Sequence, residues 1–239
     1  MKTNAITDVG RVRTENQDTC YTNEQPIGNL PNLFVVADGM GGHAGGKQAS
    51  ETALQTIVEY IEQSKETDIR LLFEQAVRRA NSAVYQEAIV KSLQGMGTTI
   101  VLATLDKDVL SVANVGDSRL YVVSPGAIKQ VTKDHSLVEE MIRMGELERS
   151  QARLHPEKNV ITRAVGAAED CKADFFQVRL DEEESILMCS DGLSNMLDDE
   201  QIRNIMNSQR DVIEKTQKLV EAANNSGGKD NITVVVVEP

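Results

Sequence analysis

The chain has 239 residues, of which 25 are basic and 37 acidic, so its formal net charge is −12. A domain of this length buries about 70 to 75% of its unfolded surface, so the fold needs no disulfide framework. The acidic balance argues against nucleic acid or an anionic membrane as a partner, because both present negative phosphates.

Extended, β-branched runs predict enough strands for two sheets. They occupy residues 3–9, 17–23, 33–37, 98–105, 109–115, 119–124, 173–180, 185–190 and 232–237. Apolar residues at helical spacing predict helices around 53–61, 72–84 and 212–223. Because strands follow one another through short turns and helices come in pairs, the pattern favours α+β over a doubly wound parallel sheet. No linker or repeat divides the chain, so residues 1–239 are expected to form one domain.

The sequence contains no segment typical of a membrane span or a secretory signal. Its apolar runs stay below the ~18 residues that a span needs, and the segment Met1 to Gly10 has no apolar centre. We therefore expect a cytoplasmic protein that does not bind membranes. Cys20, Cys171 and Cys189 form no closely spaced pair, which argues against a disulfide or a thiolate metal site.

Four aspartates occupy the same kind of position in the sequence, because each lies beside the end of an apolar run. They are Asp38, Asp117, Asp191 and Asp230. A carboxylate at the end of a buried strand is costly unless a cation or hydrogen-bond donors meet it. Any one of them is explained equally well as a turn residue, since three adjoin a glycine, but four together favour a shared site. Such a site offers only oxygen ligands, which suits Mg²⁺ or Mn²⁺ better than Zn²⁺.

Clustered carboxylates that hold two divalent cations are a common device for phosphoester hydrolysis. Arg13 is a candidate to grip the phosphate, because a guanidinium donates two parallel hydrogen bonds, although an isolated arginine is more often a solvated surface residue. The glycine-rich segment Asp38 to Lys47 does not fit a Walker loop, because Gln48 stands where Ser or Thr is needed. A cysteine phosphatase is excluded, since no cysteine is followed by arginine at the required spacing.

Six short motifs follow one another along nearly the whole chain. They are Arg13 to Asp18, Val36 to Gly42, Met96 to Thr99, Val115 to Arg119, Ser190 to Leu193 and Gly228 to Thr233. Together they resemble the metal-dependent type 2C serine/threonine protein phosphatases (PPM family), in the form of a bacterial-type minimal catalytic domain. The resemblance implies a four-layer αββα sandwich, with two mainly antiparallel sheets flanked by helix pairs and a metal site between the sheets at one end.

The resemblance also assigns metal ligands by motif position. Asp38 would bridge two metal ions, the carbonyl of Gly39 would bind one of them, and Asp191 and Asp230 would complete the other. Asp117, together with Asp191, would hold a third and weaker ion. The implied cofactors are Mn²⁺ or Mg²⁺, two in the core site and a third beside it.

Further roles and two departures follow from the same motifs. Asp18 would hold metal-bound water from behind the ligands, and Arg13 would bind the substrate phosphate. Gln17 stands where animal members have a glutamate, so metal binding there should be weaker. Met40 replaces a histidine thought to protonate the leaving group, which a thioether cannot do. His43, or a water on the third metal, is the hypothesised proton donor; the alternative for His43 is a solvent-facing residue at the start of a helix.

The expected reaction is hydrolysis of phosphoserine or phosphothreonine by direct attack of metal-bridged hydroxide, without a phosphoenzyme. The catalytic residues would be Asp38, Asp191 and Asp230, with His43 as proton donor. Residues 136–159 correspond to the flap beside the active site. Phosphoserine and phosphothreonine proteins and a cognate kinase are the expected partners of a monomeric enzyme. The alternative is a non-catalytic domain of the same fold that senses phosphoproteins or switches partners.

Overall fold

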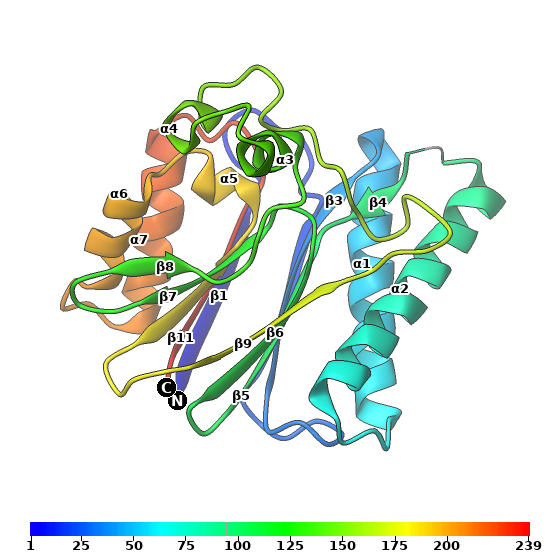
Figure 1. Ribbon diagram of the computed structural model, residues 1–239, viewed down its shortest axis with the longest axis horizontal. Coiled ribbons are helices and arrows are strands. Elements are labelled where there is room, and N and C mark those ends of the chain that lie inside the picture. The colour runs from blue at the N-terminus through cyan, green and yellow to red at the C-terminus, as the bar shows by residue number, and fades with distance from the viewer. Residues whose placement is uncertain (94) are drawn as a thin grey trace.

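Two antiparallel sheets pack face to face at the centre of the molecule, and helices cover both outer faces (Figure 1). The computed structural model describes residues 1–93 and 95–239, except for the side chains of His43 and Ala44. The predicted α+β class and the four-layer αββα sandwich are confirmed.

Within the described residues, one sheet has five strands and the other six. The first sheet runs, in spatial order, through β1 (Lys2–Asp8), β11 (Ile232–Glu238), β10 (Ser185–Cys189), β7 (Arg119–Val123) and β8 (Ile128–Gln130). The second runs through β2 (Asp18–Asn23), β3 (Leu33–Met40), β5 (Ile100–Asp106), β6 (Val109–Val115) and β9 (Asp174–Arg179), and the short β4 (Gly97–Thr98) pairs with β3.

Helices form the two outer layers and a cap over one end. One outer layer is α1 (Gly42–Gln63) and α2 (Ile69–Lys91); the other is α5 (Asp191–Ser194), α6 (Asp199–Met206) and α7 (Val212–Asn225); the cap is α3 (Leu137–Met144) and α4 (Arg149–Ala152). Side chains cap several of these helices: Asp68 accepts from Leu71 N at α2, and Asp211 accepts from Glu214 N at α7. These N-cap bonds satisfy backbone donors that have no partner inside the helix.

Alternate residues of each central strand enter different cores. In β3, Phe34 and Val36 pack between the sheets, whereas Leu33, Val35 and Ala37 pack under α1 and α2. In β11, alternate valines divide in the same way between the central core and the core under α7. Because both faces of these strands are buried, their sequences are continuous apolar runs and do not alternate between apolar and polar residues.

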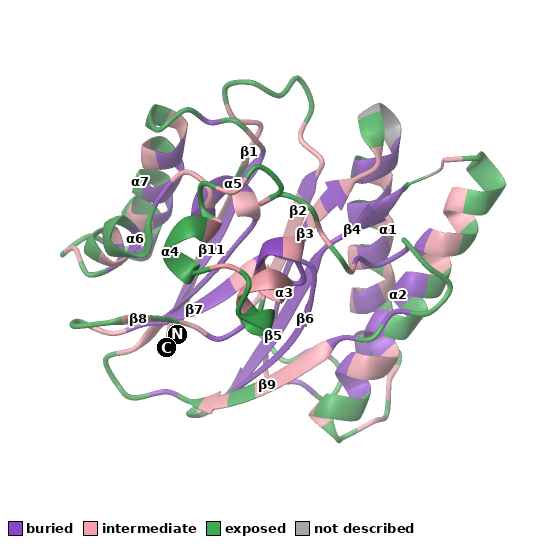
Figure 2. Ribbon diagram, turned by 45° about the horizontal axis from the view of Figure 1, so that its top comes forward, coloured by how far each residue is buried: buried purple, intermediate pink, exposed green. Residues whose placement is uncertain are grey.

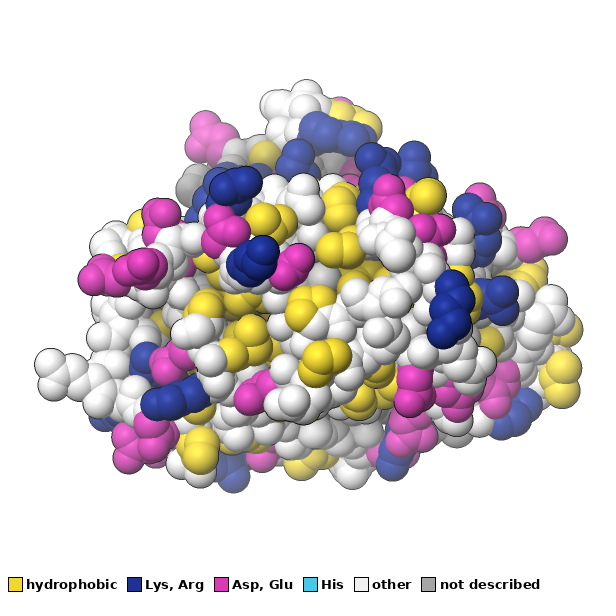
Figure 3. All heavy atoms as spheres, turned by 90° about the horizontal axis from the view of Figure 1, so that it is seen from below, with side chains coloured by type: hydrophobic (Ala, Val, Ile, Leu, Met, Phe, Trp, Pro, Cys, Tyr) yellow, Lys and Arg dark blue, Asp and Glu magenta, His cyan; other side chains and the backbone are white. Residues whose placement is uncertain are grey.

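The ends of the central strands that carry the predicted aspartates meet at one end of the molecule, under α3 and α4 (Figure 1). Figure 2 shows α4 mostly exposed and without a buried residue, as expected for a segment outside the sandwich. Both termini lie at the opposite end. That end, seen in Figure 3, mixes hydrophobic, acidic and basic side chains without a patch of a single charge. None of the helices in the described part of the chain is both long and apolar enough to cross a lipid bilayer.

Candidate active site

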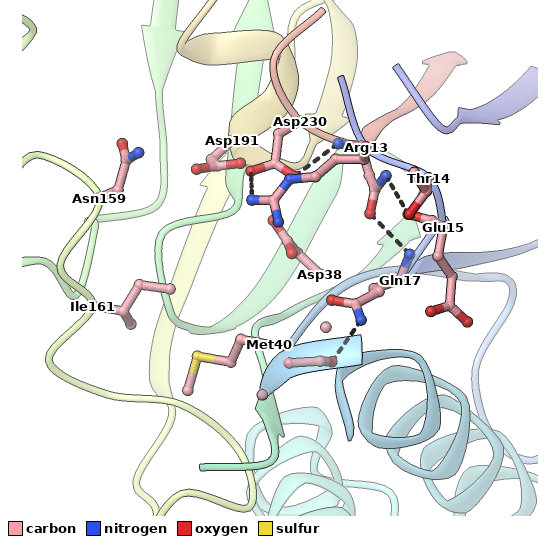
Figure 4. Close-up of a pocket in the computed structure, with 14 residues that line it drawn as sticks. Arg13, Thr14, Glu15, Gln17, Asp38, Met40, Asn159, Ile161, Asp191 and Asp230 are labelled. Atoms are coloured by element: carbon pink, nitrogen blue, oxygen red, sulfur yellow. Dashed lines mark hydrogen bonds and ion pairs between the residues drawn. The ribbon is translucent and has the colours of Figure 1, made fainter. Parts of the chain in front are cut away.

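A pocket of about 450 Å³ opens where the central strands end (Figure 4). Its described lining contains five of the predicted ligand and substrate-binding residues, which are Arg13, Asp38, Gly39, Asp191 and Asp230, and also Gln17 and Met40. They come from four distant parts of the chain: the loop after β1, the end of β3, the start of α5 and the loop before β11. The fold therefore brings one arginine and three strand-end carboxylates to the same cavity.

The backbone around Asp38 is fixed on both sides. Its N–H donates to the Thr99 hydroxyl at 3.0 Å, and its carbonyl accepts from Thr99 N and from the Thr98 hydroxyl, each at 2.8 Å. At Gly39 a Cβ atom would lie 2.0 Å from the carbonyl oxygen of Gly46, so only glycine allows α1 to approach the strand this closely. Strand, loop and helix thus hold the Asp38 carboxylate at the rim of the core.

Arg13 and Asp230 form the ion pair that closes one side of the pocket. An Nη of Arg13 donates to Oδ2 of Asp230 at 2.8 Å, and Oδ1 of Asp230 accepts from Asn231 N at 2.9 Å. The hydrogen bond that Arg13 donates to Asp230, with the charges of Asp230, Asp191 and Asp38, raises the pKa of Arg13. Its side chain is 54% exposed, so the guanidinium faces both the carboxylates and the open pocket.

Asp18 lies behind the pocket and joins two other strands. Its Oδ2 accepts from the hydroxyls of Ser190 and Thr233, both at 2.7 Å, while its buried Oδ1 has no hydrogen-bond partner. Burial raises the pKa of Asp18 to about 6. Because Ser190 precedes Asp191 and Thr233 is the second residue of β11, Asp18 fixes the strand ends that present the other carboxylates. Neither hydroxyl partner could be predicted from a local sequence pattern.

Asp117 lies in an adjoining pocket of about 340 Å³ that shares Asp191 with the first. It follows Gly116, whose φ of +99° lies in the left-handed region that favours glycine. Asp117 is 8% exposed, and its Oδ1 has no hydrogen-bond partner. Burial, and then the charge of Asp134, raises its pKa to about 7. This arrangement places Asp117 beside Asp191 and away from the wall that carries Arg13.

Met40, which stands where animal members have the proton-donating histidine, lines the first pocket. His43 belongs to the first turn of α1, but its side chain lies outside the described residues, so its predicted role stays a prediction.

Asn231 is a site residue to which the sequence assigned no role. Its amide nitrogen donates to the carbonyls of Val9 at 3.0 Å and Glu15 at 2.9 Å, and its amide oxygen accepts from Gln17 N at 2.9 Å. These three bonds fasten the loop that presents Arg13. The available signal was its position at the start of an apolar strand, where a polar side chain must find partners.

We predict that Asn231→Ala lowers the free energy of unfolding by about 1 to 3 kcal/mol, because it removes three hydrogen bonds to part-buried backbone groups. It should also raise KM for a phosphopeptide, since the loop that carries Arg13 loses its anchor. Urea unfolding and steady-state kinetics measure the two effects. Asn29→Ala is the control, because Asn29 is exposed and donates only to the carbonyl of Glu66. Equal stability of the two variants would contradict the anchoring role.

The charges at the site fit a divalent cation. Burial and the neighbouring carboxylates raise the pKa of Asp38 and of Asp191 well above the ordinary range. Unpartnered oxygens on buried aspartates and an all-oxygen donor set suit Mg²⁺ or Mn²⁺. In the described residues no three Asp, Glu, His or Cys side chains are already arranged around one ion, and Asp230 is engaged by Arg13. Cation binding would therefore compete with that ion pair.

Comparison with known proteins identifies the family. Residues 10–233 match the family model described as protein phosphatase 2C. The chain belongs to the protein phosphatase 2C family. It is 39% identical to the serine/threonine phosphatase stp of Listeria welshimeri, over 97% of this chain and 93% of that protein. The prediction of a phosphatase of this family is confirmed.

Solved structures agree with this assignment. The serine/threonine phosphatase of S. agalactiae superposes with a TM-score of 0.92 at 33% identity, covering 98% of each chain. The catalytic domain of the serine/threonine protein phosphatase PstP, solved in complex with 2 manganese ions, superposes with a TM-score of 0.85 at 31% identity, over 98% of this chain and 96% of that one.

Proposed function

We propose that this protein phosphatase 2C chain hydrolyses phosphoserine and phosphothreonine in proteins, using Mn²⁺ or Mg²⁺. The observation that carries the proposal is the convergence of three strand-end carboxylates and a half-exposed arginine on one pocket. The names of the relatives and the manganese-bound neighbour support the same reaction. The intact carboxylates do not favour the alternative of a non-catalytic sensing domain.

Asp38, the Gly39 carbonyl, Asp191 and Asp230 are the groups that would hold the two core ions, and Asp117 with Asp191 would hold a third. Bound divalent cations supply the acidity that deprotonates water near neutral pH and the positive charge that offsets the phosphoryl oxygens. The chain's own contribution is rigidity: the backbone bonds of Asp38 and the bridge made by Asp18 keep the carboxylates in place before substrate arrives.

Arg13 would orient the phosphate. Its guanidinium offers parallel donors that match two phosphate oxygens. Because Arg13 lies at the pocket rim, part of the guanidinium is accessible from the pocket. A phosphate dianion that takes over the guanidinium would release Oδ2 of Asp230. We therefore expect phosphate and cation binding to favour each other, because both need the Arg13–Asp230 pair to open.

The absence of a phosphoenzyme is supported by the side chains at the site. The described lining of the pocket contains no cysteine, serine or histidine; its one hydroxyl, on Thr14, has no histidine base in that lining, and its aspartates would be engaged by the cations. The thiols are poor nucleophiles, because burial raises the pKa of Cys20 and Cys171 to about 11 and that of Cys189 to about 12. Water is therefore the proposed nucleophile. His43 or a metal-ligated water is the hypothesised donor of the proton to the leaving group.

The test is phosphate release from a phosphothreonine peptide and from p-nitrophenyl phosphate. We expect activity with Mn²⁺ or Mg²⁺, loss of activity with EDTA, and recovery when Mn²⁺ is added back in excess. Activity that EDTA leaves unchanged would overturn the metal-dependent reaction. Tight phosphopeptide binding without phosphate release, at saturating Mn²⁺, would instead support the non-catalytic alternative.

A further inference from the structure

Three cationic side chains gather beside the candidate active site, around the turn that follows α5. Arg153 donates from an Nη to the Asn195 carbonyl at 3.3 Å, and Nζ of Lys158 lies 3.5 Å from the side-chain oxygen of Asn195. Lys229 lies near Met196 of the same turn, since a Cβ on Gly227 would touch both Lys229 Cγ and Met196 Sδ at 3.7 Å, and its charge acts on Lys158. We call Arg153, Lys158 and Lys229 the basic cluster.

The basic cluster has no carboxylate partner. Among the described residues, none of its three members forms an ion pair within 4.0 Å. Arg153 and Lys158 line the adjoining pocket that contains Asp117. Two other arginines of that pocket form ion pairs: Arg119 pairs with Asp134 at 2.6 Å, and Arg149 with Glu139 at 2.8 Å. Burial, followed by the charge of Arg153, lowers the pKa of Lys158, and Lys229 adds to this repulsion. The charge of Asp191 acts on Lys158 in the opposite direction, but among the described residues Asp191 forms no ion pair with any member of the cluster.

The position of the basic cluster relates it to the substrate path. Asn195, which accepts from Arg153 and Lys158, donates from its own amide to Oδ2 of Asp191 at 2.9 Å. Asn159, the neighbour of Lys158, lines the pocket that holds Asp38, Asp191 and Asp230. Lys229 directly precedes Asp230. The basic cluster therefore lies beside the Asn159, Asp191 and Asp230 side of that pocket, where it can meet residues that flank a phosphorylated residue bound there.

We propose that the basic cluster is a docking site for acidic side chains that flank the phosphorylated residue of a protein substrate. The proposal rests on the function proposed above and narrows its substrate class. Aspartate and glutamate carboxylates are the complement of unpaired cations, whereas a basic flank would add to their repulsion. Carboxylates also line the pocket that contains Arg153 and Lys158, but Asp134 and Glu139 are paired with arginines, and bound cations would neutralise Asp117 and Asp191. Exposed charges farther away act weakly, because screening limits them to about 10 Å at 0.1 M salt.

The experiment compares two phosphothreonine peptides of equal length, one flanked by Asp and Glu and the other by Ser and Gln. We expect kcat/KM to favour the acidic peptide by at least about fivefold, from two or three rim charge pairs, and the ratio to fall at high salt. Arg153→Glu combined with Lys158→Glu should reduce the ratio to about one or below. Lys158→Gln is the milder variant, expected to lower the ratio partway. Because the readout is a ratio, a general loss of activity does not imitate the effect.

Lys65→Glu is the matched control. Lys65 is exposed in the loop after α1, and a helix of 22 residues separates it from the pocket, which is about 33 Å at 1.5 Å per residue. It should keep the wild-type ratio. Thermal unfolding followed by circular dichroism checks that each variant is folded.

Each outcome separates the two proposals. Two outcomes overturn the docking site alone. In one, the wild type has equal kcat/KM for both peptides. In the other, Lys158→Gln and the double variant leave the ratio of the two kcat/KM values unchanged. Failure to dephosphorylate either peptide overturns the proposed function and the docking site with it. A third peptide carries a second phosphothreonine in a neutral flank. A higher kcat/KM for this peptide, without a higher kcat/KM for the peptide flanked by Asp and Glu, would show that the cluster binds phosphate and would overturn acidic side chains as the occupant.

Discussion

Asp38→Asn is expected to lower turnover of a phosphothreonine peptide by at least about 10³-fold. Asp38 lies at the centre of the carboxylate group, as the charges of Asp18, Asp191 and Asp117 that raise its pKa indicate. The amide keeps the size of the side chain but removes the charge that would attract a cation. Steady-state phosphate release at saturating Mn²⁺ measures the loss.

A second measurement distinguishes this loss from misfolding. In the metal-free protein, Asp38→Asn should be at least as stable as the wild type, because it removes a buried carboxylate surrounded by others. Mn²⁺ at a hundredfold excess over its Kd should stabilise the wild type by about 2.7 kcal/mol per site and the variant much less. Asp106→Asn, an exposed change at the turn after β5, is the control that should match the wild type. Wild-type turnover in Asp38→Asn would remove Asp38 from the site.

The main elements of the fold could be predicted because their patterns are long. Strands with both faces buried appear as apolar runs, and the stripes of α1, α2 and α7 extend over several turns. β8 was missed because three edge residues show no clear period. α6 was missed because it spans only eight residues, and its signal is the capping box of Asp198 and Gln201 rather than a long stripe.

At the site, the carboxylates could be predicted from the sequence, whereas their hydrogen-bond partners could not. A charged residue at the end of an apolar run is visible locally, so Asp38, Asp191 and Asp230 could be singled out. Their hydrogen-bond partners are set by tertiary packing: Arg13 and Asp230 lie 217 residues apart in sequence, and Asp18 and Thr233 lie 215 apart. No local pattern predicts which distant polar groups will meet.

In the metal-free protein, the free energy of unfolding is expected to fall as the pH rises from about 5 to about 7.5. Asp18, with its pKa raised from 3.8 to about 6, and Asp117, raised from 3.8 to about 7, hold their protons more tightly when folded. The stability that this supplies is complete below the unfolded value and is lost as the pH rises through the folded value. For Asp18 alone the difference corresponds to about 3 kcal/mol.

Other groups act in the opposite direction but do not reverse the sign. The lowered pKa values of Asp174 and Glu87 matter only near and below their ordinary range, under pH 5. The lowered pKa of His135 adds stability as the pH rises towards 6.5, but it is one group against the raised pKa values of several aspartates, including Asp38 and Asp191. The carboxylates therefore determine the slope above pH 5.

Urea unfolding in EDTA at pH 5, 6, 7 and 7.5 measures this slope. Asp117→Asn should flatten it, because the amide does not titrate, whereas Asp106→Asn should leave it as in the wild type. With excess Mn²⁺ the slope should reverse, since a cation binds the deprotonated carboxylates and its binding releases protons. Metal-free stability that rises between pH 5 and 7.5 would mean that the carboxylates do not repel one another in the folded chain, which would undercut their assignment to one shared site.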